Sequence, residues 1–111
     1  MSATVYPTVE QALLVTLALV TDREGVDPTE AALYVETWRR WPEVVGLAGY
    51  KREHPDTALM ARALRGKRGL VGQMLAHVDA HTEQVGLTNA GHDLACKVGP
   101  RFVRSAKAGG A

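Results

Sequence analysis

The chain has 111 residues, of which 46% are hydrophobic and 23% charged, and its formal net charge is +1. This length and balance predict one globular domain with a single core and exclude a largely disordered chain. One cysteine excludes an intrachain disulfide, and no apolar run reaches the roughly 20 residues that span a bilayer, so with no signal peptide evident we expect a cytoplasmic protein with no membrane partner.

The N-terminal part of the chain predicts a long helix over residues 8–23. Thr8 and Gln11 match a capping box, and apolar residues recur at helical spacing behind them. Gly25 ends the helix. Its apolar face is broad, which indicates burial on more than one side and offers a surface through which two copies pair as a homodimer.

A second helix start lies at Asp27 and Pro28. Asp27 is placed to accept hydrogen bonds from the first free amides, and Pro28 suits the first helical position. We therefore expect a helix over residues 29–41. Pro42 interrupts it and opens a short third helix over residues 42–48.

Three aromatic residues fall on this second helix: Tyr34, Trp38 and Trp41. Large aromatic side chains at helical spacing usually pack in a core, and we expect that role here. An exposed tryptophan would instead mark a partner interface.

A further helix and a β-hairpin are predicted in the middle of the chain. Residues 50–54 form a basic loop, and the Pro-Asp-Thr sequence that follows starts a helix over residues 57–65. Residues 70–77 and 83–87 predict two strands joined by a short polar connection.

A last helix is expected over residues 89–98. Thr88 caps it, and Gly99 with Pro100 stops it. Residues 105–111 have nothing to bury and should form a flexible tail behind a domain of residues 1–104.

The run from residue 58 to residue 95 resembles MarR-type and PadR-type transcriptional regulators. The piece ARALRGKRGLV is similar to the end of their recognition helix, HVDAHT to their wing tip, and VGLTNAGHDLA to their second wing strand and the helix that follows. The resemblance implies an α+β, mainly α winged helix-turn-helix fold, with a two-stranded β-hairpin wing at residues 70–87 and a C-terminal helix. Either 29–41 or 42–48 is the partner of the recognition helix.

Within that resemblance, four residues argue for the fold. Leu64 anchors the recognition helix in the core, and Gly69 permits a sharp turn from the helix into the first wing strand. Leu70 and Val71 start that strand and pack beneath the helix.

Basic residues point to duplex DNA as the partner. Residues 1–48 hold three basic and seven acidic residues (net −4), whereas residues 49–111 hold ten basic and five acidic residues (net +5). Arg62 and Arg65 lie one turn apart on the expected exposed face of the recognition helix, where side chains reach base edges and phosphates. The full set of expected DNA contacts is Thr57, Ala61, Arg62, Arg65, Lys67, Arg68, Lys51, Arg52, His77 and His81.

We therefore expect a DNA-binding transcriptional regulator that needs no cofactor. The alternative is a winged-helix protein-interaction module, such as a phage or mobile-element accessory protein, without sequence-specific DNA binding. The acidic N-terminal half favours this alternative, as does a wing tip that carries histidines where arginines are common.

Catalysis and metal binding find less support. The glycines of RGKRGLVG do not follow a strand and open a helix, and the only serines lie near the two ends of the chain, so we expect no enzyme. Zinc-type ligands occur as two pairs, His77 with His81 and His92 with Cys96. Cys96 is better explained as a small buried side chain, and we expect no metal site.

Overall fold

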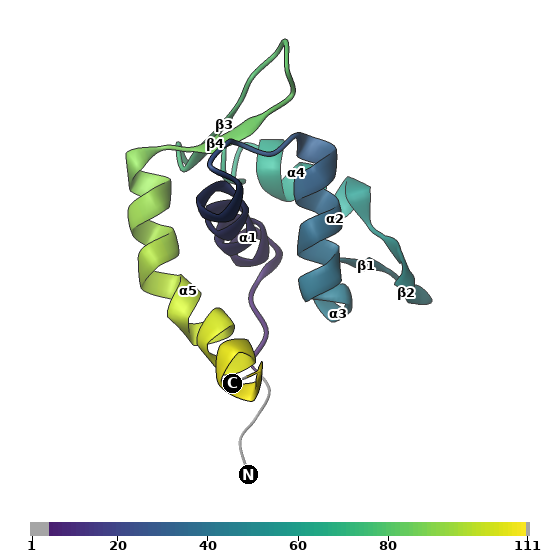
Figure 1. Ribbon diagram of the computed structural model, residues 1–111. Helices are drawn as coiled ribbons and strands as arrows, with labels where there is room; N and C mark the ends of the chain where they lie inside the picture. The colour runs from purple at the N-terminus through teal and green to yellow at the C-terminus, as the bar shows by residue number, and fades with distance from the viewer. Residues whose placement is uncertain (1–4, 111) are drawn as a thin grey trace.

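The computed structural model describes residues 5–110, with their side chains up to residue 102. The protein is a mixed α+β molecule in which helices dominate and two separate antiparallel hairpins are inserted (Figure 1). The elements in chain order are α1 (Val9–Glu24), α2 (Glu30–Arg40), α3 (Pro42–Val45), β1 (Gly46–Leu47), β2 (Tyr50–Pro55), α4 (Thr57–Arg65), β3 (Ala76–Val78), β4 (Val85–Leu87) and α5 (Asn89–Gly110).

Helix α1 is the central element, with α2 and α4 on one side of it and α5 on the other (Figure 1). The predicted capping box is confirmed, because the side chains of Thr8 and Gln11 each accept a hydrogen bond from the other residue's amide. Gly25 ends the helix in the left-handed conformation. Seven residues of α1 are buried inside the monomer, which confirms the expected burial of this helix on more than one side.

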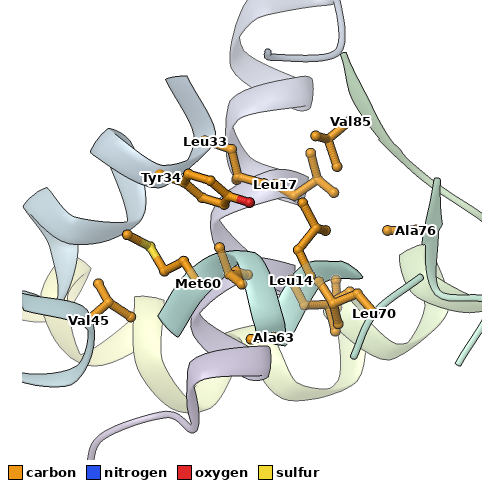
Figure 2. Close-up of a cluster of buried hydrophobic side chains, with 13 residues drawn as sticks. Leu14, Leu17, Leu33, Tyr34, Val45, Met60, Ala63, Leu70, Ala76 and Val85 are labelled. Carbon is orange, nitrogen blue, oxygen red and sulfur yellow. The ribbon is translucent and has the colours of Figure 1, made fainter. Parts of the chain in front are cut away.

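The core collects apolar side chains from every helix and from the β3–β4 hairpin (Figure 2). The expected core packing of the aromatic residues is confirmed for Tyr34 and Trp38, whereas Trp41 is half-buried outside the core cluster. Tyr34 is buried, Trp38 packs against the core while its indole N–H donates to the carbonyl of Lys51 at 2.7 Å, and the ring of Trp41 meets Phe102 edge-on at 6.3 Å.

The residues between α2 and α4 differ from the prediction. Thr29, and not Asp27, caps α2 by accepting a hydrogen bond from the amide of Ala32. The short third helix ends at Val45, and the expected basic loop over residues 50–54 is strand β2, paired with β1. A hairpin forms because Gly49 adopts a positive φ of 86° in the tight turn that reverses the chain.

The segment that follows α4 also differs. Leu70 and Val71 do not start a strand, because their amides donate to the carbonyls of Ala63 and Leu64, both at 2.9 Å. These bonds satisfy carbonyls that the end of a helix leaves free, and they turn the chain back onto α4. Strand β3 begins only at Ala76, and the second strand is likewise shorter than expected, so the predicted wing strands are reduced to three residues each.

The β3–β4 hairpin pairs in register, with His77 opposite Gly86. The entry to α2 lies alongside this hairpin, since Thr29 forms an isolated antiparallel bridge with Gln84. Two backbone bonds support the bridge: the amide of Val85 donates to the carbonyl of Pro28 at 2.8 Å, and the amide of Glu30 donates to the carbonyl of Glu83 at 2.9 Å. A third chain segment therefore borders the two strands.

Helix α5 is longer than predicted. The expected cap is confirmed, because Thr88 Oγ1 accepts from the amide of Gly91 at 3.0 Å. Pro100 does not stop the helix, which continues to Gly110. A proline removes one donor and strains the preceding turn, yet an interior proline is accommodated where surrounding contacts hold the helix, and here Phe102 packs against Trp41 just beyond it. The side chains of residues 103–110 and all of Ala111 lie outside the described part, so the expected flexible tail stays a prediction.

No helix in the described part of the chain combines the length and the apolar character needed to cross a membrane.

Candidate nucleic-acid interface

Helix α4 has one buried face and one exposed face. Met60, Ala63 and Leu64 point into the core, and the Asp56 carboxylate caps the helix by accepting from the amide of Leu59 at 3.0 Å. Thr57, Arg62 and Arg65 are exposed, as expected, and Ala58 is exposed beside them. Ala61 is the exception among the expected contacts, because it is half-buried and packs against the core.

Three cations near the end of α4 form what we call the α4 basic cluster: Arg62, Lys67 and Arg68. All three are exposed, and within residues 5–102 none has a carboxylate within 4.0 Å. Arg68 holds the turn through its backbone, since its carbonyl accepts from the Gln73 amide group at 2.6 Å. The side chains of the cluster are therefore available to anions in solution.

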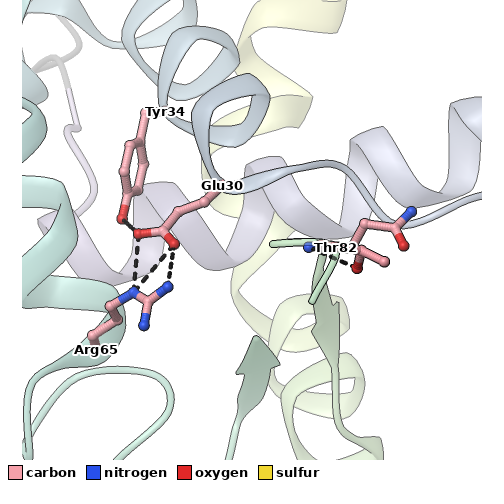
Figure 3. Close-up of polar contacts among 5 residues, drawn as sticks. Glu30, Tyr34, Arg65 and Thr82 are labelled. Atoms are coloured by element: carbon pink, nitrogen blue, oxygen red, sulfur yellow. Dashed lines mark hydrogen bonds and ion pairs between the residues drawn. The ribbon is translucent and has the colours of Figure 1, made fainter. Parts of the chain in front are cut away.

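Unlike the three cations of the cluster, Arg65 forms an ion pair with a residue of helix α2 (Figure 3). Its Nη2 lies 2.6 Å from Oε1 of Glu30, and its Nε lies 3.1 Å from both carboxylate oxygens. The hydroxyl of Tyr34 donates to the same carboxylate. Arg65 is still 53% exposed, whereas Glu30 is only 17% exposed.

The titration of these groups follows from the contacts. The hydrogen bond from Arg65 holds the pKa of Glu30 below its ordinary value against the opposing effect of burial. The hydrogen bond to Glu30 raises the pKa of Arg65. Burial, followed by the hydrogen bond to Glu30, raises the pKa of Tyr34. All three groups thus keep their ordinary protonation states near neutral pH.

Lys51 and Arg52 lie on strand β2, which leads directly into α4. Both are exposed. Arg52 pairs with Glu43 at 2.9 Å, and Lys51 contributes its carbonyl to the Trp38 indole while its side chain stays at the surface. The structure thus places these two predicted contacts on a hairpin of their own, separate from the α4 basic cluster.

The tip of the β3–β4 hairpin is acidic. His77 and His81 are exposed, as predicted, but Asp79 lies between them and accepts from the amides of His81 and Thr82 at 2.8 and 3.0 Å. These backbone bonds hold the pKa of Asp79 below its ordinary value. With Glu83 close by and no lysine or arginine in residues 76–87, the tip offers little attraction to phosphate.

The zinc alternative is not assembled within residues 5–102, where no three side chains among His, Cys, Asp and Glu are grouped to hold a metal ion. Cys96 Sγ lies 3.9 Å from His92 Nδ1. Contrary to the expected burial, Cys96 is exposed.

Sequence reasoning missed two residues of this region, Glu30 and Tyr34. Their i, i+4 spacing on α2 is visible in the sequence and is compatible with a side-chain contact. Their partner is Arg65, which lies 35 residues from Glu30 in the sequence. No local sequence pattern predicts a contact over that separation.

Comparisons with protein-family models, with curated proteins and with solved structures give no match for this chain.

Proposed function

We propose that this protein binds duplex DNA in the manner of a winged helix, with α4 as the recognition helix. Three features support the proposal: a helix with an exposed basic face, a two-stranded hairpin as the next element along the chain, and a short segment before α2 that borders this hairpin. A small sheet of this kind beside a helical core is the arrangement that the resemblance to MarR-type and PadR-type regulators implies. The β1–β2 hairpin is then an insertion ahead of α4.

In this proposal two helices together take the role of the partner helix of α4. Helix α3 packs against α4, while α2 reaches α4 through the Glu30–Arg65 ion pair. Together they hold α4 with its buried face inward, and Arg62 remains on the outward face where a groove of DNA would lie.

The observation that carries the proposal is the α4 basic cluster. Phosphate neutralisation supplies much of the affinity of proteins for DNA, and three exposed cations without an intramolecular carboxylate partner keep their full attraction for phosphate. Lys51 on the neighbouring strand β2 adds a fourth exposed cation, also without a carboxylate within 4.0 Å in the described part of the chain.

The test compares two charge-matched double variants by fluorescence anisotropy on a labelled 20-bp duplex of random sequence at low salt. R62A/R68A removes two cations of the α4 basic cluster. K97A/R101A removes two exposed cations from α5, which lies on the other side of α1. We expect R62A/R68A to weaken binding by on the order of tenfold or more, and K97A/R101A to change it by less than about twofold.

Two results contradict the proposal. One is the absence of DNA binding by the wild-type protein at low salt. The other is an equal loss in the two variants, which would indicate that only the net charge matters.

A protein-interaction module is the second candidate, and the β1–β2 hairpin favours it. Leu47 and Tyr50 are partners across the hairpin and are 41% and 58% exposed. Exposed large side chains of this kind mark many protein interfaces. A wild-type protein that fails to bind DNA would leave this candidate in place.

Homodimerisation also stays a proposal. Because seven residues of α1 are buried within the monomer, less of its apolar face is left for pairing than the sequence suggests, and we expect a dimer to use another surface as well. Sedimentation velocity over a range of protein concentrations measures it directly.

A further inference from the structure

Arg65 has one free edge. A guanidinium carries five N–H donors in a rigid fork. Glu30 takes the side formed by Nε and Nη2, with distances of 3.1 and 2.6 Å. The end of the fork, where Nη1 and Nη2 each direct an N–H outward, meets no carboxylate of residues 5–102 other than that of Glu30, and the side chain is 53% exposed (Figure 3).

The free edge is held in place. Glu30 is mostly buried, and Tyr34 donates to its carboxylate, so neither oxygen is free to rotate away from Arg65. An arginine fixed by a carboxylate loses little conformational entropy when it binds a second acceptor pair. A side chain that only has to lie near a phosphate gains little from being fixed in this way. A side chain that must hydrogen-bond two acceptors at a set spacing gains more.

The charges around Arg65 disfavour a phosphate as the group that binds to its free edge. Glu30 neutralises Arg65, and Glu83 is near enough to stabilise the charged form of Arg65 further. An anionic phosphate approaching this place meets two carboxylates beside one guanidinium. A neutral acceptor pair meets no such repulsion, and the O6 and N7 atoms of guanine in the major groove form the pair that arginine binds most often.

We propose that Arg65 reads guanine through its free edge, and that Glu30 and Tyr34 are the positioning residues that fix it. This inference rests on the proposed DNA-binding function. It divides the basic residues of α4 into two groups: Arg62, Lys67 and Arg68 contact phosphates of any sequence, and Arg65 supplies base specificity.

The experiment measures affinity for three 20-bp duplexes at moderate salt. One alternates G and C, one carries 7-deazaguanine at every G of the same sequence, and one alternates A and T. The deaza duplex keeps base pairing and phosphates but lacks the N7 acceptor. We expect the full-length wild-type protein to bind the GC duplex on the order of tenfold more tightly than the other two.

Three variants test the roles of the residues. R65K keeps the charge but loses the fork, and E30Q loses the charge that fixes it. Both should bind the GC duplex no better than the deaza duplex, while their affinity for the AT duplex changes by less than about threefold. The swap E30R/R65E restores an ion pair between α2 and α4, so it should recover thermal stability without recovering the preference for guanine.

The outcomes are distinct. Wild-type protein that binds all three duplexes equally contradicts the inference and leaves the proposed DNA-binding function standing. R65K and E30Q that weaken binding to all duplexes by the same factor assign Arg65 to phosphate contact or to structure, which also contradicts it. Recovery of the guanine preference in the swap shows that the pair serves structure alone. Wild-type protein that binds no duplex at low salt overturns the proposed function and this inference together.

Discussion

At the scale of single residues, the two exposed arginines of α4 have unlike surroundings. The sequence places Arg62 and Arg65 on one helical face, and the structure agrees. Yet Arg62 has no carboxylate partner among the described residues, and Arg65 is joined to Glu30 by a bidentate ion pair. Helical spacing predicts the face that a side chain occupies, whereas a contact between residues 30 and 65 depends on how α2 packs in three dimensions.

The Glu30–Arg65 pair makes a prediction about pH. The pKa of Glu30 is below its ordinary value in the folded protein, so the pair stabilises the fold above pH 4.5 and this contribution is lost as the pH falls through the lowered pKa. Because Arg65 is 53% exposed, solvent screens the pair and we expect a contribution of only about 1 kcal/mol.

Urea unfolding of wild type and E30Q at pH 7 and at pH 3 measures this contribution. Between pH 7 and pH 3 the free energy of unfolding should fall further in the wild-type protein than in E30Q. The difference between the two decreases equals the contribution of the ion pair. The difference between the two proteins isolates Glu30 from the other carboxylates. An equal loss in both would show that Glu30 titrates in the folded protein as it does in the unfolded chain.

At the scale of elements, the helices and the presence of the β3–β4 hairpin were predictable, but the bounds of its strands and the β1–β2 hairpin were not. Local signals for α1 are strong, and its capping box and its terminal glycine occur where expected. The residues after α4 are rich in apolar side chains, as a strand would be, but Leu70 is buried because the chain folds back onto α4. A buried turn and a buried strand both need apolar side chains, so hydropathy alone does not separate them.

Gly69 makes this turn possible, though not by the helix-to-strand geometry that the sequence implied. A Cβ at this position would lie 2.3 Å from the carbonyl oxygen of Ala63, so the fold-back of residues 69–71 needs a glycine. We expect G69A to destabilise the protein by about 1–3 kcal/mol, as overpacked sites do.

Chemical denaturation of G69A checks this, with K67A as the control in the same turn. Lys67 is exposed, and its truncation should change stability by less than about 0.5 kcal/mol. A G69A protein as stable as the wild type would mean that the turn relaxes freely and does not constrain α4.

At the scale of the whole molecule, the net charges of the two halves of the sequence describe the distribution of charged side chains only in part. The C-terminal half is basic, but its cations separate into the α4 basic cluster, the ion-paired Arg65, strand β2 and helix α5. The tip of the β3–β4 hairpin is acidic instead, and its Asp79 is fixed by two backbone amides. The candidate interface is therefore centred on α4 and not on the hairpin.

The predicted α+β class is confirmed, and the order of elements from α4 to α5 agrees with the sequence reading. The pairing of Thr29 with Gln84 and the β1–β2 hairpin escaped prediction. The bridge joins segments more than 50 residues apart, and the hairpin contains only a two-residue first strand, too short to produce a recognisable alternation.

The most direct test of DNA binding through α4 is the salt dependence of affinity for a random 20-bp duplex. Each phosphate contact contributes about −0.9 to the slope of log K against log salt concentration. If the three cations of the α4 basic cluster each neutralise one phosphate, their share is about −2.7, and R62A/R68A should make the wild-type slope shallower by about 1.8. A slope that is the same in R62A/R68A and in wild type would contradict the account, because the cluster would then play no part in holding DNA.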